Sequence, residues 1–292
     1  MIALTVSAVA QEVEIRRWNQ LPVDQNFAVL SFLQTSGTIA TDPVLQIEDA
    51  RVDLKTTLVG YIRTFALFDK TARFELRQAI QDGTWSGTLS GVPTTVERTG
   101  IGDTVARFAI NLIGGPPLSG KAYADYRAGV REETILGAAL AVSLPTGQYD
   151  PDKLINLGAN RFSFRPQIGL QHRQDNWVFE VSGTAFLFTP NNDFFSGSRR
   201  TQAPLYSADG SIEYDFEGGA WISAGAGVGT GARSTVDGVP KNDERLDVGW
   251  EASAGFPITS KVSFRASYLG TQNLNAIGLA AHTVSVGLQT TW

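Results

Sequence analysis

The chain has 292 residues, a formal net charge of −5 and no cysteine. The lack of cysteine excludes disulfides and thiolate metal sites, and the acidic balance without a basic tract argues against a nucleic-acid partner. Mean hydropathy of −0.06, with no apolar run long enough for a membrane helix, excludes a bundle of such helices. A transmembrane β-barrel remains compatible, because only alternate residues of its strands touch lipid.

The amino-terminal residues have the composition of an export signal. Residues 1–10, MIALTVSAVA, are mostly apolar and end in the small-x-small pattern of a signal-peptidase site. A basic region is missing and the stretch is short, so an ordinary first strand is the alternative. We interpret residues 1–10 as the remnant of a secretory signal whose start is truncated, with the mature protein beginning near Gln11.

Residues 11–25 do not alternate cleanly and precede the first strand. Arg16, Arg17 and Trp18 can fold into a barrel lumen as a partial plug, or the segment can rest on the rim as a periplasmic tail. The sequence does not choose between these two placements.

From residue 26 to residue 292, polar and apolar residues alternate in about twelve segments of a length that suits tilted membrane-spanning strands. The segments lie near 26–36, 51–66, 71–80, 103–113, 132–144, 161–173, 176–189, 205–216, 219–230, 245–256, 261–271 and 281–292. This pattern predicts an all-β protein in which residues 26–292 form a closed antiparallel transmembrane β-barrel with an up-and-down meander.

The connections alternate in length. Those after the odd-numbered segments are long, at 37–50, 81–102, 145–160, 190–204, 231–244 and 272–280, whereas 67–70, 174–175, 217–218 and 257–260 are short. With a periplasmic amino terminus, the long connections face the cell exterior and the short ones face the periplasm. The exception, 114–131, is long on the periplasmic side and is predicted to hold a short helix.

The chain ends on an alternating strand that finishes in Trp292. Its apolar face suits lipid, and its place at the terminus predicts pairing with the first strand to close the barrel. Aromatic residues near strand ends are predicted to form interfacial girdles. These residues are Tyr206, Phe216, Trp221, Phe256, Tyr268 and Trp292.

Alternation also assigns charged side chains to the interior. The predicted lumen and constriction residues are Arg63, Arg73, Arg77, Arg107, Arg161, Arg165, Glu180, Asp209, Glu213 and Glu251, and the same pattern turns Asp53 and Lys55 inward. The arginines belong to the second to sixth strands and the carboxylates to the seventh to tenth, so the two arcs can pair across a narrow bore. They either rigidify the wall as salt bridges or form a polarised eyelet that orients a passing solute.

The sequence offers little for catalysis. Its two histidines, His172 and His282, are predicted at opposite ends of the barrel, and no motif joins either to a nucleophile. The acidic loops lack calcium-loop spacing. We therefore expect no enzyme, no catalytic residues, no metal site and no cofactor.

Several segments are similar to one known family. They are Arg16–Trp18 with Leu21-Pro22, Asp42–Leu45 with Ile47–Ala50, Tyr61-x-Arg63-Thr64-Phe65, Leu144–Asp150 continuing through Lys153–Pro166, and Asn192–Phe195. On these residues the chain resembles the family named for the meta-pathway of phenol degradation, outer-membrane transporters. The resemblance implies an outer-membrane barrel that moves hydrophobic or aromatic compounds, and it supplies no catalytic residue.

The loop between the fifth and sixth strands is the predicted mouth. Tyr149, Asn156 and Asn160 can fold over or into it, and Phe194 and Phe195 lie near the same rim as an aromatic landing surface. The alternative for these aromatic residues is packing within the girdle and loops.

These patterns predict a passive channel or transporter for small hydrophobic or aromatic compounds in a Gram-negative outer membrane, with a periplasmic amino terminus. The alternatives are a plugged structural or adhesion barrel and an outer-membrane lipid hydrolase. The expected partners are outer-membrane lipids and lipopolysaccharide, the barrel-assembly machinery during biogenesis and a small-molecule solute, with no nucleic acid.

Overall fold

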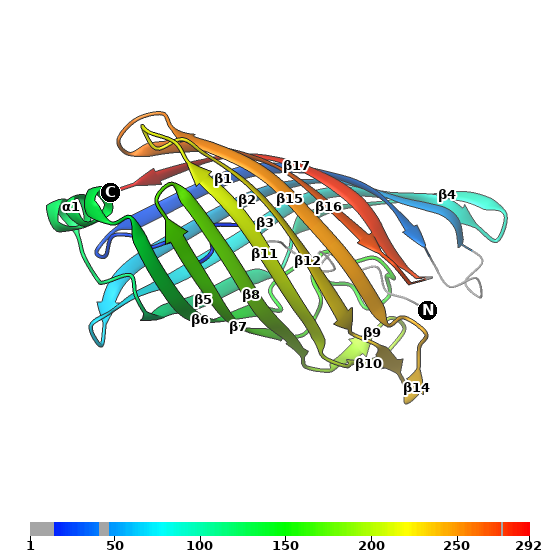
Figure 1. Cartoon of the computed structure of the whole chain (residues 1–292). Helices are drawn as coiled ribbons and strands as arrows, with labels where there is room; N and C mark the ends of the chain where they lie inside the picture. The colour runs from blue at the N-terminus through cyan, green and yellow to red at the C-terminus, as the bar shows by residue number, and fades with distance from the viewer. Residues whose placement is uncertain (1–14, 41–46, 276) are drawn as a thin grey trace.

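The computed structural model describes residues 15–40, 47–275 and 277–292, and in it one antiparallel sheet closes into a barrel (Figure 1). The proposed signal remnant lies outside the described residues. The barrel contains twelve of the thirteen strands of this sheet, all but β4. They are β1 (Asn26–Ala40), β2 (Ile47–Leu67), β3 (Lys70–Leu89), β5 (Thr104–Ile113), β6 (Glu132–Leu144), β7 (Ser163–Gln174), β8 (Trp177–Phe188), β11 (Leu205–Asp215), β12 (Trp221–Gly231), β15 (Arg245–Pro257), β16 (Val262–Asn273) and β17 (Gly278–Thr291).

The first and last strands close the barrel as predicted. β1 pairs with β17 in antiparallel register, with Phe27 opposite Thr291. Beyond the last strand residue, the Trp292 N–H donates to the Asn26 carbonyl at 3.1 Å, and the Trp292 carbonyl accepts the Asn26 N–H at 3.0 Å. Because each of the twelve barrel strands then has two neighbouring strands, the barrel wall has no free strand edge with unpaired backbone groups facing lipid. The predicted closed, up-and-down barrel of twelve strands is confirmed.

The two ends of the barrel differ in their connections. One end, here called the turn end, holds Trp292, the short β2–β3, β7–β8, β11–β12 and β15–β16 turns, and helix α1 (Gly120–Gly129). The other, the loop end, holds the small strands β9 (Asn191–Phe194), β10 (Ser198–Gln202), β13 (Ser234–Val236) and β14 (Val239–Pro240), which form a separate sheet. Figure 1 shows α1 and these small strands at opposite ends. The helix predicted within 114–131 is present, and within the described residues no helix could span a membrane.

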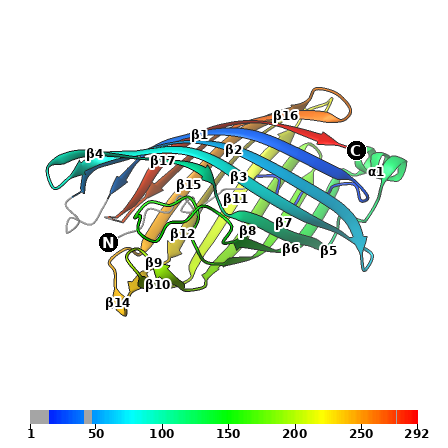
Figure 2. The same cartoon turned by 180° about the vertical axis from the view of Figure 1, so that it is seen from behind.

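The expected long loop 81–102 is instead a hairpin. β3 continues to Leu89 and pairs with β4 (Val92–Ile101), so that both strands project past the barrel wall (Figure 2). Ser90 and Gly91 connect them with positive φ angles of 49° and 80°, as a tight two-residue hairpin turn requires. Alternation continues through this region, with Trp85 buried on the inner face, and this is why the strand does not end near residue 80.

The outer face of the barrel is apolar and carries most of the predicted girdle residues. Tyr206, Phe216, Phe256, Tyr268 and Trp292 are exposed. Trp221 is an exception and the prediction for it was wrong. It shares the inner face of β12 with buried Ser223, and the guanidinium carbon of Arg16 lies 4.6 Å from its ring centroid.

Candidate functional site: the lumen and its mouth

Eight of the ten predicted lumen residues lie on the inner face of their strands. They are Arg73, Arg77, Arg107, Arg165, Glu180, Asp209, Glu213 and Glu251. Arg161 lies just before β7 and belongs to the mouth described below. A polar interior of this kind, opposite an apolar exterior, is the side-chain arrangement of a membrane barrel.

One cluster of arginines surrounds a single carboxylate. Glu75, only 5% exposed, accepts Arg73 at 2.8 Å, Arg107 at 2.5 Å and Arg77 at 3.1 Å. Arg107 also donates to Gln167 of β7 at 3.0 Å, which links neighbouring parts of the wall. Three arginines of this arc of the lumen therefore converge on one carboxylate.

The acidic residues lie on the other arc, as predicted. Glu213 and Asp215 of β11 pair with Arg16 at 2.6 and 3.1 Å, and Asp215 also accepts Arg173 at 2.5 Å. Glu251 of β15 pairs with Arg265 of β16 at 2.6 Å. Glu251 and Arg265 are on adjacent strands, Asp215 and Arg173 are on strands separated by β8, and Arg16 belongs to the segment that precedes β1.

The prediction for Arg63 was wrong, and so were those for Asp53 and Lys55. In β2, Val52, Leu54 and Thr64 face inward and are buried, so the odd-numbered residues face outward. Arg63 lies near the turn end, 3.7 Å from Asp24. β2 is longer than an apolar membrane band requires, and outward charges near its ends can therefore stay in contact with water or headgroups.

The segment before β1 occupies the lumen, which is the plug placement of the two alternatives. Trp18 is 1% exposed, and its indole Nε1 donates to Ser182 Oγ at 2.8 Å. The backbone N–H groups of Arg17 and Trp18 donate to the Glu180 carboxylate at 3.1 and 3.2 Å. We call residues 15–25 the inner segment.

Two glycines of the wall make room for the indole. A Cβ added at Gly137 of β6 would lie 2.2 Å from a Trp18 ring carbon, and one at Gly169 of β7 would lie 2.0 Å from Trp18 Nε1. The guanidinium carbon of Arg107 lies 5.5 Å from the Trp18 ring centroid. The inner segment is therefore packed against the wall as closely as a protein core.

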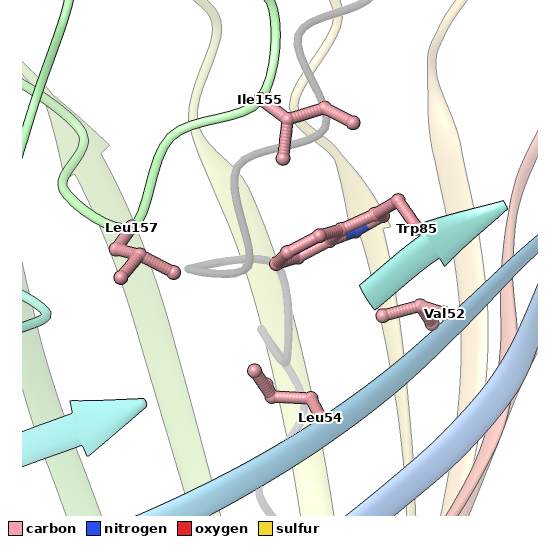
Figure 3. Close-up of a cluster of buried hydrophobic side chains, with 5 residues drawn as sticks. All are labelled: Val52, Leu54, Trp85, Ile155 and Leu157. Atoms are coloured by element: carbon pink, nitrogen blue, oxygen red, sulfur yellow. The ribbon is translucent and has the colours of Figure 1, made fainter. Parts of the chain in front are cut away.

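At the loop end, residues 145–162 fold inward, and we call them the mouth loop. Ile155 and Leu157 pack with Val52, Leu54 and Trp85 of the β2–β3 wall (Figure 3). The residue between them, Asn156, is buried and hydrogen-bonds within its own loop, accepting from Asp150 N at 2.8 Å and donating to Asp150 O at 3.0 Å and Lys153 O at 2.8 Å.

Both stems of the mouth loop are attached to one carboxylate. Asp103, just before β5, accepts the Gly147 and Ala159 N–H groups, each at 2.9 Å. Burial raises the pKa of Asp103, and these two hydrogen bonds act against that rise. The loop is thus a fixed cover rather than a loose connection.

A cavity, which we call the mouth cavity, lies between the mouth loop and the β9–β10 hairpin. Its walls are Tyr149, Lys153, Leu154, Asn156, Ala159, Arg161, Asn191, Phe194 and Arg200. Of the five predicted mouth residues, Tyr149, Asn156 and Phe194 line it. Asn160 lies beside it and donates to Asn191 at 3.1 Å, and Phe195 is half-buried outside the wall.

Sequence reasoning missed five wall residues of this cavity, of which Asn191 and Arg200 lie outside the mouth loop. The Asn191 amide donates to Tyr149 Oη at 3.0 Å, and Arg200 is 9% exposed. Both belong to the β9–β10 hairpin, inside a region interpreted only as a loop. The alternation of the short 198–202 stretch was the one available signal, and by itself it did not place Arg200 near the mouth loop.

The histidines face outward at opposite ends of the barrel, as predicted. His172 Nδ1 lies 2.9 Å from Thr134 Oγ1, and His282 Nδ1 lies 2.6 Å from Tyr268 Oη. Each is thus beside a hydroxyl but far from the other. Within residues 15–40, 47–275 and 277–292, no group of three histidine or carboxylate side chains could hold a metal ion.

Comparisons with known proteins agree with this architecture. The family model described as "Putative MetA-pathway of phenol degradation" matches residues 32–276. Among curated proteins, no sequence matches the chain.

Two solved structures are similar in fold. The COG4313 outer membrane channel from Pseudomonas putida F1 has 20% sequence identity and a TM-score of 0.76, over 96% of this chain and 100% of that one. The transport unit of the autotransporter AIDA-I from Escherichia coli has 7% identity and a TM-score of 0.50, over 97% and 94% of the two chains. Both likenesses concern the fold, which is that of an outer-membrane β-barrel.

Proposed function

The chain belongs to the family described as "Putative MetA-pathway of phenol degradation", and from that premise we propose that it is a passive outer-membrane channel for small hydrophobic or aromatic compounds. The observation that carries this proposal is that both closures of the polar lumen, the inner segment and the mouth loop, are built from chain outside the barrel wall. Either can move without breaking the sheet. The name of the Pseudomonas putida relative, an outer membrane channel, supports the same function.

The orientation belongs to the proposal. The turn end, with its short connections and the start of β1, faces the periplasm, and the loop end faces the cell exterior and its lipopolysaccharide. The last strand, which ends in an exposed Trp292, is the segment offered to the assembly machinery.

The proposed route begins at the mouth cavity and continues into the charged lumen. The β7–β8 ladder leaves out Arg165 and Pro166 and keeps the same register on both sides of them. Proline has no N–H to donate to a strand ladder. Phe186 on the inner face and Leu187 on the outer face flank this weaker point of the wall, and we propose it as the place where an apolar solute leaves the lumen for lipid.

Single-channel conductance tests the function. In planar bilayers the native protein should conduct small ions in brief events of low conductance. Trp18→Ala should raise conductance severalfold, because it removes the side chain that fills the lumen between Gly137, Gly169 and Ser182. Trp177→Ala is the matched control, since Trp177 faces outward near the same end and should leave conductance unchanged.

The alternative of a plugged structural barrel has one observation in its favour, namely that both closures are in place in this structure. It makes the opposite prediction. If neither the native protein nor the Trp18→Ala variant conducts, and neither admits labelled aromatic solutes into liposomes, the channel function is wrong.

A further inference from the structure

The mouth cavity has an unbalanced set of charges. Three of its walls are cations, Lys153, Arg161 and Arg200, and none of its described walls is a carboxylate. Lys153 is half-exposed and pairs with Asp150 at 2.6 Å on the loop surface. The two arginines are much less exposed and have no comparable partner.

Arg161 has hydrogen-bonding capacity left over. One guanidinium nitrogen, Nη2, donates to Gln202 Oε1, and the guanidinium carbon lies 4.5 Å from the Phe188 ring centroid. The other terminal nitrogen, Nη1, is buried and has no hydrogen-bond partner within the described part of the chain. An unmade hydrogen bond at a buried charged donor is costly, and it marks the place where a ligand oxygen can bind.

Arg200 is similarly underused. Its nearest carboxylate, Asp243, lies 4.0 Å away, and that carboxylate already accepts the backbone N–H and the hydroxyl of Ser234. Burial lowers the pKa of Arg200, and burial together with the neighbouring Arg200 charge lowers the pKa of Arg161 to about 9. The two guanidinium groups therefore repel each other in a site where water screens them little.

The shape of the cavity suits a small group attached to a ring. Its empty volume is about 320 Å³ when the solvent at its opening is included, but the enclosed part is close to the size of a water molecule. A compact oxyanion fits the enclosed part, whereas a ring has to lie toward the opening. Tyr149 and Phe194 line the cavity, and Tyr149 is held by Asn191 and by the Asp193 carbonyl at 3.1 Å.

We propose that the mouth cavity binds the carboxylate of a small aromatic acid, with the oxygens on Arg161 and Arg200 and the ring against Tyr149 and Phe194. Guanidinium groups are the side chains best matched to a carboxylate, and a bound anion offsets their mutual repulsion. The inference deepens the channel function by naming its substrate class, and it rests on that function only for transport after binding.

Calorimetric titration of the whole detergent-folded protein with benzoate tests the site. Benzoate should bind about tenfold or more tightly than acetate, which lacks the ring, and than benzyl alcohol, which lacks the charge. Arg161→Gln and Arg200→Gln should each weaken benzoate binding about tenfold or more. Arg233→Gln is the control, because Arg233 is an exposed arginine of the loop end paired with Glu244 at 3.1 Å and outside the cavity wall.

Folding of each variant is checked by its heat-dependent migration in gels. Lys153→Gln is a further variant, which should fold like the native protein because the Lys153 side chain is half-exposed. It should weaken benzoate binding severalfold. The inference is overturned if both arginine variants bind benzoate as tightly as Arg233→Gln does, or if inorganic phosphate competes as well as benzoate, which would indicate a general oxyanion site. Benzoate binding without conductance in the bilayer assay would instead overturn the channel function and leave the site intact.

Discussion

Arg161 shows how the environment of one residue sets its chemistry. It lies between β6 and β7, where burial and the charge of Arg200 favour its neutral form, while Asp103 and Tyr149 favour the charged form. The balance lowers its pKa to about 9, far below the usual range of arginine. Burial raises the pKa of Tyr149 above its ordinary value of 10, so this phenol is still neutral where Arg161 titrates.

Benzoate affinity should therefore fall as pH rises from 7 to 10. A benzoate carboxyl is ionised throughout this range, so the loss comes from the protein. Below about pH 9 the Arg161 guanidinium is protonated and attracts the anion, and above it the proton and the attraction are lost. The expected loss is up to about tenfold for one unit beyond the pKa. Calorimetric titrations of the protein with benzoate at about pH 7 and about pH 10 would measure this loss of affinity.

The Arg161→Gln variant is the control for this pH dependence. It should show a clearly smaller loss between the two pH values, because the group whose pKa lies near 9 has been removed. A native affinity that stays constant or increases toward pH 10 would contradict the assignment of Arg161 as the titrating ligand.

Residue-level prediction from sequence succeeded where alternation was strongly polarised. Glu180 and Glu213 stand between apolar neighbours, and both face the lumen. Arg63 was placed inward because charge was expected there, yet in β2 it has the opposite parity to buried Val52 and Leu54 and therefore faces outward. Trp221 was placed outward because β12 is rich in glycine and alanine, so few polar side chains marked its inner face.

Among the elements, the mouth loop combines two kinds of anchoring. Apolar contacts of Ile155 and Leu157 attach it to the β2–β3 wall, and the Asn156 side chain fixes the turn between them from within. Loss of the side-chain amide would leave Asp150 N and Lys153 O without their partner. The loop conformation thus depends on one polar side chain as well as on the apolar contacts with the wall.

Asn156→Ala should loosen the mouth loop without unfolding the barrel. It removes three hydrogen bonds within the loop, each worth about 1 kcal/mol. Lys153 is a half-exposed trypsin site in the same loop, so tryptic cleavage after Lys153 should accelerate about tenfold or more, as followed by mass spectrometry. Asn192→Ala is the matched control, since Asn192 is an exposed asparagine of β9. Equal cleavage rates in the two variants would contradict the anchoring role of Asn156.

Element-level prediction was most accurate for the strands of the wall. Their alternation runs the length of the barrel and predicted their number and, except in β2 and at Trp221 of β12, their inner and outer faces. The hairpins beyond the wall were harder: β9 and β10 are too short for periodicity to stand out, and β4 was hidden inside an expected loop. The mouth loop was expected to fold over or into the mouth, but its packing against Trp85, which is distant in sequence, could not be predicted from local pattern.

For the whole molecule, the two ends of the barrel define its relation to the membrane. The outer face is apolar along the wall, and the connections differ sharply between the ends. The turn end, which is proposed to be the side from which the barrel inserts, has mostly short turns. The hairpins β9–β10 and β13–β14 and the β3–β4 extension all lie at the loop end. This asymmetry is the physical basis for the proposed orientation.

Cysteine labelling can test that orientation directly, because the chain has no cysteine and so no background. Val239→Cys puts a thiol on the exposed β13–β14 hairpin at the loop end, and Glu217→Cys puts one in the exposed β11–β12 turn at the turn end. In intact cells a membrane-impermeant maleimide that is too large for the lumen should label Val239→Cys, and it should reach Glu217→Cys only after the outer membrane is permeabilised. Labelling in the reverse order would place the turn end and α1 outside the cell, and the mouth cavity would then face the periplasm.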